Sequence, residues 1–338
     1  MCSSDLAAPR PHDVPMTRAV VCGLGLVGRR IARQLTDTGA FSKVVVSDRS
    51  LKRAESTAAL LGSHGEVLAW PVSPAALRDA AVVVSALPED HDVEIVAHAL
   101  GAGVPAVSVA DGSATIQGLL ALDERAKVVG VPVVVGCGFA PGISDVLAAH
   151  AATIFEHVDE VRVARAGASG GASIAAVRRE RREVPTVWRH GRWVETKRLV
   201  EQVWFPDPIG AVDCQAVRAG GDLLARHFGP DTAVTTTWAE TRPSRWPQRD
   251  DDGLGAVRVE VWGRDAHGVC DVVVYGVLDR VSLAVGTLAG IVGERVGGGE
   301  VDAAGVFGVA DLFDPVSVLR DLDQRGVHAA AFEGAPIS

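Results

Sequence analysis

The chain has few cysteines, and they follow no pattern that builds a cross-link or a metal site. The five stand at positions 2, 22, 137, 214 and 270, so their number is odd and no two form a C-x-x-C pair. Neither a disulfide framework nor a zinc site is indicated, and we predict no metal site. Unpaired thiols are typical of a reducing compartment, so we expect a cytoplasmic protein.

Long apolar runs and an excess of positive charge are also missing. Residues 1–16 are polar and contain proline, without the apolar stretch of a signal peptide, and we expect them to form a disordered arm. No later segment reaches the charge-free length of a membrane span. The net charge of −9 leaves no basic excess for nucleic acid phosphates. We therefore predict neither a membrane nor a nucleic acid as a partner.

Glycine is present where a nucleotide-binding turn would need it. The apolar run at 19–22 leads into glycines at G-x-G-x-x-G spacing, and an amphipathic helix follows. In such a turn, Gly23 permits the tight bend, Gly25 lets the backbone approach a pyrophosphate, and Gly28 lets helix and strand pack closely. The anion then lies at the helix N-terminus. We expect the cofactor to contact Gly23, Gly25, Leu26, Val27 and Gly28.

An acidic residue follows at the distance that a dinucleotide site requires. A second apolar run, 44–46, ends just before Asp48, about 20 residues after Gly28. Asp48 is expected to bind the ribose hydroxyls, and its charge would repel a 2′-phosphate and favour NAD. The adjacent Arg49 could stack on adenine or pair with the phosphate of NADP. We predict NAD as the cofactor, with NADP as the alternative.

Strand-like and helix-like segments alternate through the first half of the chain. Further strands are expected at 66–69, 82–85, 106–109 and 131–135. Runs of consecutive valines suit strands covered on both faces, so the fold class is α/β with a doubly wound parallel Rossmann sheet. Ligands bind beyond the carboxyl ends of such strands, which selects the loops 86–90, 110–113 and 136–142. From these loops we expect the cofactor to contact Ala86, Leu87, Pro88 and Gly138.

The pattern changes after about residue 155, which indicates a second domain. Short strands are expected at 158–165, 186–188, 192–195, 233–240, 257–263 and 269–277. They predict an α+β domain with a mostly antiparallel sheet. Six of the seven tryptophans lie there, which favours a buried or interfacial face. We divide the chain into the arm 1–16, a dinucleotide-binding domain 17–150, a substrate and dimerisation domain 151–280, and C-terminal helices 281–338 that return to the first domain.

Seven motifs carry a family resemblance from residue 17 onward. They are the glycine loop at 23–28, Ala86-Leu87-Pro88, Asp111, the Pro-Gly segment 138–142, and the segments 185–191, 205–210 and 322–326. On these motifs the chain resembles the saccharopine dehydrogenase-like oxidoreductases. Within that family it resembles the branch of lysine 6-dehydrogenase and saccharopine reductase. The resemblance implies hydride transfer between a nicotinamide cofactor and a carbon bonded to nitrogen, through an imine, with an amino acid or diamine as substrate.

Asp111 is our first choice for the carboxylate that such a reaction uses to meet an ammonium or iminium group. It follows a strand, so the carboxyl-end rule places it beside the cofactor. The same residue precedes Gly112-Ser113 and a helical segment, where it could instead be the N-cap. Both roles remain open at the level of sequence.

Arg179 is the second candidate catalytic residue, and it departs from the family pattern. Lysine 6-dehydrogenase-like chains carry an Asn-Glu pair where this chain has Arg179-Glu180, counting back from Pro185. An arginine can bind a carboxylate with two parallel hydrogen bonds, which an amide cannot. The resemblance therefore implies the reaction class, while Arg179 favours an acidic substrate over lysine. A surface helix with paired charges would also explain the charged segment 178–183.

Two other functions begin from the same glycine loop. A nucleotide-sensing domain of the kind that regulates potassium transport would bind NAD or ATP without chemistry, but it would end near residue 140. A synthase of homospermidine type would reduce and reoxidise bound NAD within one cycle. In every case the partner is a small molecule. The small-residue helix at 281–296 and the tryptophan-rich sheet also predict a homodimer.

Overall fold

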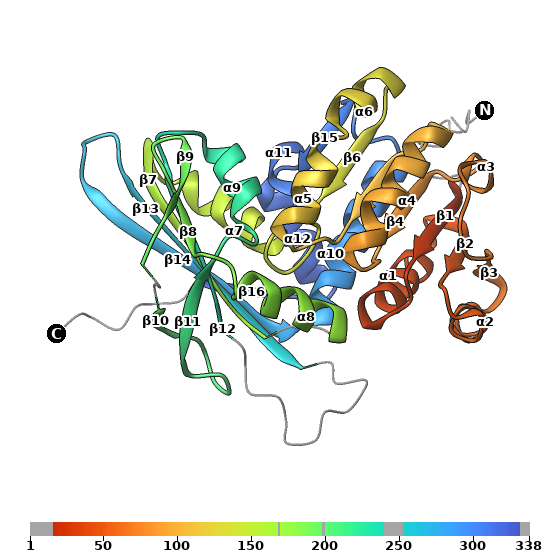
Figure 1. The fold of residues 1–338 in the computed structure, drawn as a ribbon, viewed down its shortest axis with the longest axis horizontal. Helices are drawn as coiled ribbons and strands as arrows, with labels where there is room; N and C mark the ends of the chain where they lie inside the picture. Colours follow the sequence, from red (N-terminus) through yellow and green to blue (C-terminus); the bar gives the residue numbers. More distant parts are fainter. Residues whose placement is uncertain (1–15, 168–169, 198–199, 240–252, 332–338) are drawn as a thin grey trace, which may run out of the picture.

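The computed structural model describes residues 16–167, 170–197, 200–239 and 253–331. Apart from Met16, the expected arm lies outside these residues, as do Glu240 and Trp246. Two sheets lie side by side, with helices between them and around the first (Figure 1). None of the described helices combines the length and apolarity that a membrane crossing needs.

The first sheet is a doubly wound parallel sheet, as the sequence predicts. Its strand order is β3-β2-β1-β4-β5-β6-β15, and every neighbouring pair is parallel. The strands are β1 (Met16–Cys22), β2 (Phe41–Ser47), β3 (Gly65–Val67), β4 (Val82–Ser85), β5 (Ala106–Ser108), β6 (Pro132–Val135) and β15 (Gly305–Gly308). The chain order reverses between β1 and β4, and that is where a ligand binds in such sheets.

Helices cover both faces of this sheet, which explains the valine runs. The helices are α1 (Leu26–Asp37), α2 (Leu51–Leu60), α3 (Pro74–Leu77), α4 (Glu89–Ala102), α5 (Ser113–Leu120) and α6 (Asp123–Val129), with a 3-10 turn at Gly62–His64. Val82 and Val84 point into the core with α1, and Val83 points into the core with α4 and α5. All three valines are fully buried, as consecutive positions in a parallel strand require.

The second sheet is mixed, because β7 and β12 run parallel while its other pairs are antiparallel. Its main order is β10-β11-β12-β7-β13-β14-β16. The strands are β7 (His157–Ala166), β10 (Val200–Trp204), β11 (Ala211–Val217), β12 (Ala233–Ala239), β13 (Leu254–Arg264), β14 (Cys270–Arg280) and β16 (Ala329–Ala331), with the hairpin β8 (Thr186–Arg189) and β9 (Arg192–Glu195) beside β12. The expectation of a mostly antiparallel second sheet is confirmed.

The remaining helices join the two sheets. They are α7 (Ile143–Ala152), α8 (Gly170–Glu180), α9 (Gly221–Phe228), α10 (Val281–Gly297), α11 (Val309–Leu312) and α12 (Pro315–Gln324). The segment after residue 280 contains two strands besides the expected helices. β15 extends the first sheet, and β16 extends the second. The sequence of β15, Gly-Val-Phe-Gly, and that of β16, Ala-Ala-Ala, lack the runs of β-branched residues that indicated the other short strands.

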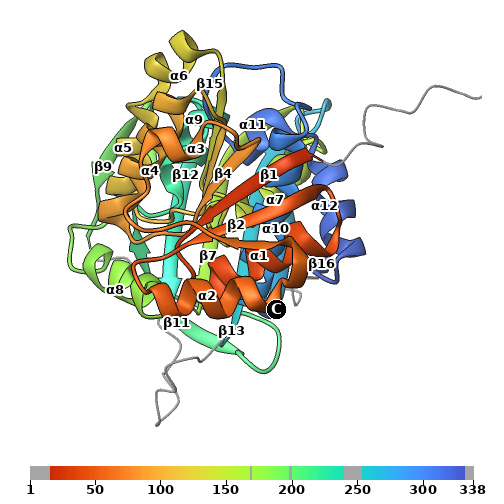
Figure 2. The ribbon, with the colours of Figure 1, turned by 90° about the vertical axis from the view of Figure 1, so that its right-hand side faces the viewer.

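The small residues of α10 serve contact within the chain. Figure 2 shows α10 beside α1, and a Cβ at Gly286 would lie 2.5 Å from the Cβ of Arg30. A Cβ at Gly290 would lie 2.8 Å from the Cβ of Gln34. The spacing of these glycines therefore sets how closely α1, the helix of the glycine-rich turn, can approach its neighbour.

We expect Gly286→Ala to lower the free energy of unfolding by about 1–3 kcal/mol, because the new methyl group would overlap with α1. Gly171→Ala is the matched control, since a Cβ there meets nothing within 4 Å. It should be neutral or stabilise the protein by up to about 1 kcal/mol, through helix propensity. Urea unfolding followed by circular dichroism measures both, and equal effects would contradict the close α1–α10 contact.

Candidate active site

The glycine-rich turn between β1 and α1 leaves room on one side only. Gly23 has a φ of +86°, and a Cβ there would lie 2.5 Å from the carbonyl oxygen of Ala86. A Cβ at Gly28 would lie 1.7 Å from the carbonyl oxygen of Gly23, so neither position accepts a side chain. Gly25 differs, because it is exposed and a Cβ there would meet nothing within 4 Å. The open space beside Gly25 fits a pyrophosphate against the backbone.

The N-terminus of α1 suits an anion at this place. Gly25 is its N-cap, no side chain caps the helix, and its first turn holds no acidic residue. The amides of Leu26 and Val27 therefore begin a helix whose dipole presents positive charge toward the open space. Of these two side chains, Val27 also lines the adjoining pocket.

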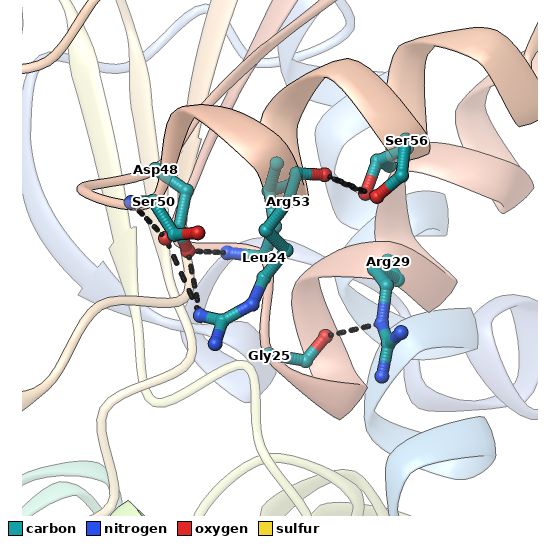
Figure 3. A network of polar contacts seen from close by, with 8 residues as sticks. Leu24, Gly25, Arg29, Asp48, Ser50, Arg53 and Ser56 are labelled. Atoms are coloured by element: carbon teal, nitrogen blue, oxygen red, sulfur yellow. Dashed lines mark hydrogen bonds and ion pairs between the residues drawn. The ribbon is translucent and has the colours of Figure 1, made fainter.

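Asp48 lies at the carboxyl end of β2 and fastens this turn (Figure 3). Its Oδ2 accepts the amide N–H of Leu24 at 2.8 Å, and its Oδ1 accepts the amide N–H of Ser50 at 2.8 Å. The Nη1 of Arg53 lies 3.3 Å from both oxygens. Arg49, predicted from sequence to meet the adenosine, is exposed beside Asp48, whereas Arg53 was not predicted.

A pocket of about 220 Å³ connects the cofactor side of the first domain to the second domain. Five predicted cofactor residues line it: Val27, Ala86, Leu87, Pro88 and Gly138. Both predicted catalytic residues, Asp111 and Arg179, line it as well. The structure therefore brings these seven residues together, while the ribose end at Asp48 and Arg49 lies outside the pocket lining.

Asp111 does not cap the helix that follows it, because the N-cap of α5 is Gly112 and no side chain caps that helix. Its Oδ2 instead accepts hydrogen bonds from Arg165 Nη1 at 3.1 Å and from the hydroxyl of Ser173 at 3.3 Å. Within the described residues, Oδ1 has no hydrogen-bond partner. Of the two roles that sequence analysis left open for Asp111, the N-cap is not realised.

Arg165 is the functional candidate that sequence analysis missed. It ends β7 with 3% of its surface exposed, and its guanidinium lies 4.0 Å from the ring centroid of Trp238. Nη1 also donates to the carbonyl oxygen of Ala140 at 3.1 Å. Burial lowers the pKa of Arg165, and the neighbouring Asp111 opposes that change. No local pattern in the sequence indicates this residue, because its contact with Asp111 arises only from the packing of β7 against a loop 54 positions earlier.

Helix α8 closes the pocket from the second domain. Ser173 and Arg179 lie on it six residues apart, and both line the pocket together with Ala172, Ala175 and Ala176. Arg179 is exposed. The predicted charged surface helix is present in part, because α8 ends at Glu180.

Glu180 joins α8 to the loop that carries Asp111. Its Oε1 accepts the backbone N–H of Ser113 at 2.8 Å, and the Ser113 hydroxyl donates to Asp222. Oε2 is buried and has no partner among the described residues. Burial raises the pKa of the Glu180 carboxyl to about 7, and the nearby charge of Glu183 adds to this effect.

Two further buried carboxyls support the loops around the pocket. Asp92 on α4 accepts a hydrogen bond from the hydroxyl of Ser108, at the end of β5, and burial raises its pKa to about 6. Asp145 on α7 accepts the hydroxyl of Ser144, and burial raises its pKa to about 7. No group of three or more acidic, histidine or cysteine side chains in the described part of the chain could hold a metal ion.

Replacing Glu180 by glutamine should change how stability depends on pH. The folded protein retains a proton on Glu180 between about pH 4.3 and 7, whereas the unfolded chain has released it. The contribution of Glu180 to the free energy of unfolding therefore falls as the pH rises through this window. Relative to the parent, Glu180→Gln should gain up to about 3 kcal/mol between pH 5 and pH 8.

Urea unfolding at both pH values measures this difference. Comparison with the parent protein is needed because Asp92 and Asp145 contribute with the same sign. Glu195→Gln makes the same substitution at an exposed position at the end of β9, and its free energy of unfolding relative to the parent should change by less than about 0.5 kcal/mol between the two pH values. A pH-independent difference for Glu180→Gln would show that its carboxyl does not retain the proton.

No family model matches the chain. Over 85 residues it is 39% identical to shikimate dehydrogenase (NADP(+)) of Methylocella silvestris, a match that covers 25% of this chain and 29% of that protein. The chain thus spans under a third of the length of this curated relative.

Solved structures match over nearly the whole chain. Saccharopine dehydrogenase (L-Glu forming) from Saccharomyces cerevisiae has a TM-score of 0.72 and 14% identity, covering 94% of this chain and 100% of that chain. A variant of meso-dapdh from Clostridium tetani, solved with DAP, has a TM-score of 0.54 and 12% identity, covering 91% and 98%. The chain therefore has the two-domain fold of these dehydrogenases, in agreement with the resemblance that its motifs carry.

Proposed function

We propose that this protein is an NAD(P)-dependent oxidoreductase that transfers a hydride to or from a carbon bonded to nitrogen in a small substrate. One observation supports this most directly: a single pocket is lined both by residues beside the glycine-rich turn, such as Val27, and by the polar pair Asp111 and Arg165. Hydride transfer requires that a nicotinamide and a substrate carbon be held together in this way.

The cofactor we propose is NAD or NADP. Its pyrophosphate would lie at Gly25 and the N-terminus of α1, and its adenosine ribose at Asp48. When bound, the cofactor supplies the hydride acceptor or donor, and the protein supplies orientation and charge. The curated relative from Methylocella silvestris is named for NADP(+), which supports this cofactor class.

The charges around the pocket support a substrate with both an amino group and a carboxylate. Asp111 offers Oδ1 to an ammonium or iminium group, while Arg165 and Ser173 fix the orientation of its carboxylate through Oδ2. Arg179 can bind a substrate carboxylate with two parallel hydrogen bonds. The yeast neighbour is named for saccharopine and the clostridial one was solved with DAP, which also favours an amino acid.

In the oxidative direction, the substrate carbon gives up a hydride, the nitrogen loses a proton, and a C=N bond forms. We propose that the Asp111 carboxylate attracts the ammonium group and accepts that proton, which then passes to solvent. Water then adds to the C=N bond, which yields a carbonyl compound and an amine or ammonia. The reductive direction runs through the same imine with each transfer reversed.

The first test is the formation of NADH or NADPH, followed at 340 nm with a panel of amino acids, acidic amino acids and diamines. We expect turnover with substrates that carry an ammonium group and a carboxylate, and better kcat/KM for acidic substrates than for lysine. Tight dinucleotide binding without any turnover would contradict this proposal and favour a closed-cycle synthase or a nucleotide sensor.

Two variants test the assigned roles. Arg179→Gln should raise the KM of a carboxylate-bearing substrate at least tenfold with a smaller change in kcat, because uniform binding is lost. Arg178→Gln is its matched control, because Arg178 is the preceding residue of α8 and lies outside the pocket lining. It should leave KM and kcat within about threefold of the parent values. Asp111→Asn should lower kcat by about 100-fold or more. Equal effects of the two arginine variants would contradict the role of Arg179.

We also propose a homodimer, with the second sheet as its interface. The helices α7 and α9 lie on one side of this sheet in Figure 1, and Trp262 on β13 keeps 40% of its surface exposed. Aromatic residues on an open sheet face are typical of subunit interfaces. Light scattering after size exclusion should give about twice the chain mass of 35.2 kDa, and a mass equal to one chain would contradict the proposal.

A further inference from the structure

An ion pair between Asp48 and Arg53 lies at the predicted ribose end of the dinucleotide site (Figure 3). Arg53 lies in the first turn of α2, directly beyond the loop that carries Asp48. Its Nη1 reaches both carboxylate oxygens at 3.3 Å. A cation therefore already lies beside the carboxylate that would select against a phosphate.

Asp48 keeps its position without this arginine. Two backbone amides, of Leu24 and Ser50, donate to it at 2.8 Å, and only 6% of the Asp48 side chain is exposed. A carboxylate has about four lone-pair sites, so these contacts leave capacity for a ribose hydroxyl. The carboxylate is thus fixed by the backbone, and the arginine is an additional partner.

Arg53, in contrast, is loosely held. Its side chain is 47% exposed, and its distances to Asp48 are longer than those of well-formed charged hydrogen bonds. Ion pairs of this kind contribute little to stability, typically between 0 and about 1 kcal/mol. The guanidinium can therefore leave Asp48 for a stronger anion at small energetic cost.

We propose that Arg53 is an exchangeable counter-ion that lets the adenosine end of the site accept the 2′-phosphate of NADP as well as the 2′-hydroxyl of NAD. The proposal rests on the proposed function, because it names the cofactor range of the same site. With NAD, Arg53 stays on Asp48, and the carboxylate accepts the ribose hydroxyl. With NADP, the guanidinium turns from Asp48 to the phosphate, which it can bind with two parallel hydrogen bonds.

Two features make this exchange favourable. A phosphate beside Asp48 alone would be repelled by the carboxylate, and the positive charge of Arg53 next to that carboxylate would offset the repulsion. Arg49 adds a second exposed cation next to Asp48. One carboxylate and two arginines therefore give a site whose charge suits either cofactor.

The test is a binding titration that needs no substrate. Dissociation constants for NADH and NADPH are measured by cofactor fluorescence for the full chain and its variants. The parent protein should bind both within about tenfold of each other. Arg53→Gln should weaken NADPH at least tenfold, or about 1.4 kcal/mol, and change NADH by less than threefold.

Lys52→Gln is the matched control, because it removes the same charge from the neighbouring exposed position of α2. It should change both constants by less than threefold. Asp48→Asn keeps the shape of the side chain and removes its charge, so it should shift preference toward NADPH. The affinity of the parent for NADPH should also fall more steeply with salt than its affinity for NADH.

The outcomes separate this proposal from the proposed function. Equal weakening of both cofactors by Arg53→Gln, or equal effects of the arginine and lysine variants, would overturn the role of Arg53 even if the enzyme turns over. A parent protein that excludes NADPH would also overturn it. Failure to bind either dinucleotide would instead contradict the proposed function itself.

Discussion

The ion pair between the buried Arg165 and the half-buried Asp111 is the interaction on which the pocket depends. Arg165 ends a strand of the second sheet, and Asp111 follows a strand of the first, so the pair joins the two domains at the place where each offers its carboxyl end. A guanidinium buried to this degree is stable only with a carboxylate and further acceptors, which Asp111 and the Ala140 carbonyl supply. Separating the two groups would leave the buried charge of Arg165 without its carboxylate. The ion pair therefore favours the observed packing of β7 against the loop at Asp111.

The same pair limits what the pocket can bind. Oδ2 of Asp111 accepts hydrogen bonds from Arg165 and from Ser173 of α8, so a ligand that met this carboxylate in the proposed function would use Oδ1. Helix α8 contacts this loop twice, once through Ser173 and once through Glu180, which accepts the amide of Ser113. These two contacts hold α8 against the loop that carries Asp111 on one side of the pocket.

Local rules in the sequence predict the cofactor side well. The glycines at 23, 25 and 28 follow a fixed spacing within one turn, and Asp48 follows from a spacing within a single β-α-β unit. The consecutive valines of β4 indicate a strand covered on both faces, and the structure confirms it. These features are visible as residue spacings and as runs of consecutive residues, so one sequence is enough to recognise them.

The substrate side could not be predicted in the same way. Arg165 is one arginine among many, and its role appears only when β7 is placed against the loop at Asp111, 54 positions earlier. Arg53, at the ribose end of the site, was missed for a similar reason. Its proposed role depends on the ion pair with Asp48, which forms when the first turn of α2 brings the two side chains together. In both cases the arginine can be singled out only by the carboxylate that the fold places beside it. The ion pairs of Arg165 and Arg53 therefore depend on tertiary packing, whereas the glycine-rich turn follows from a pattern that the sequence encodes locally.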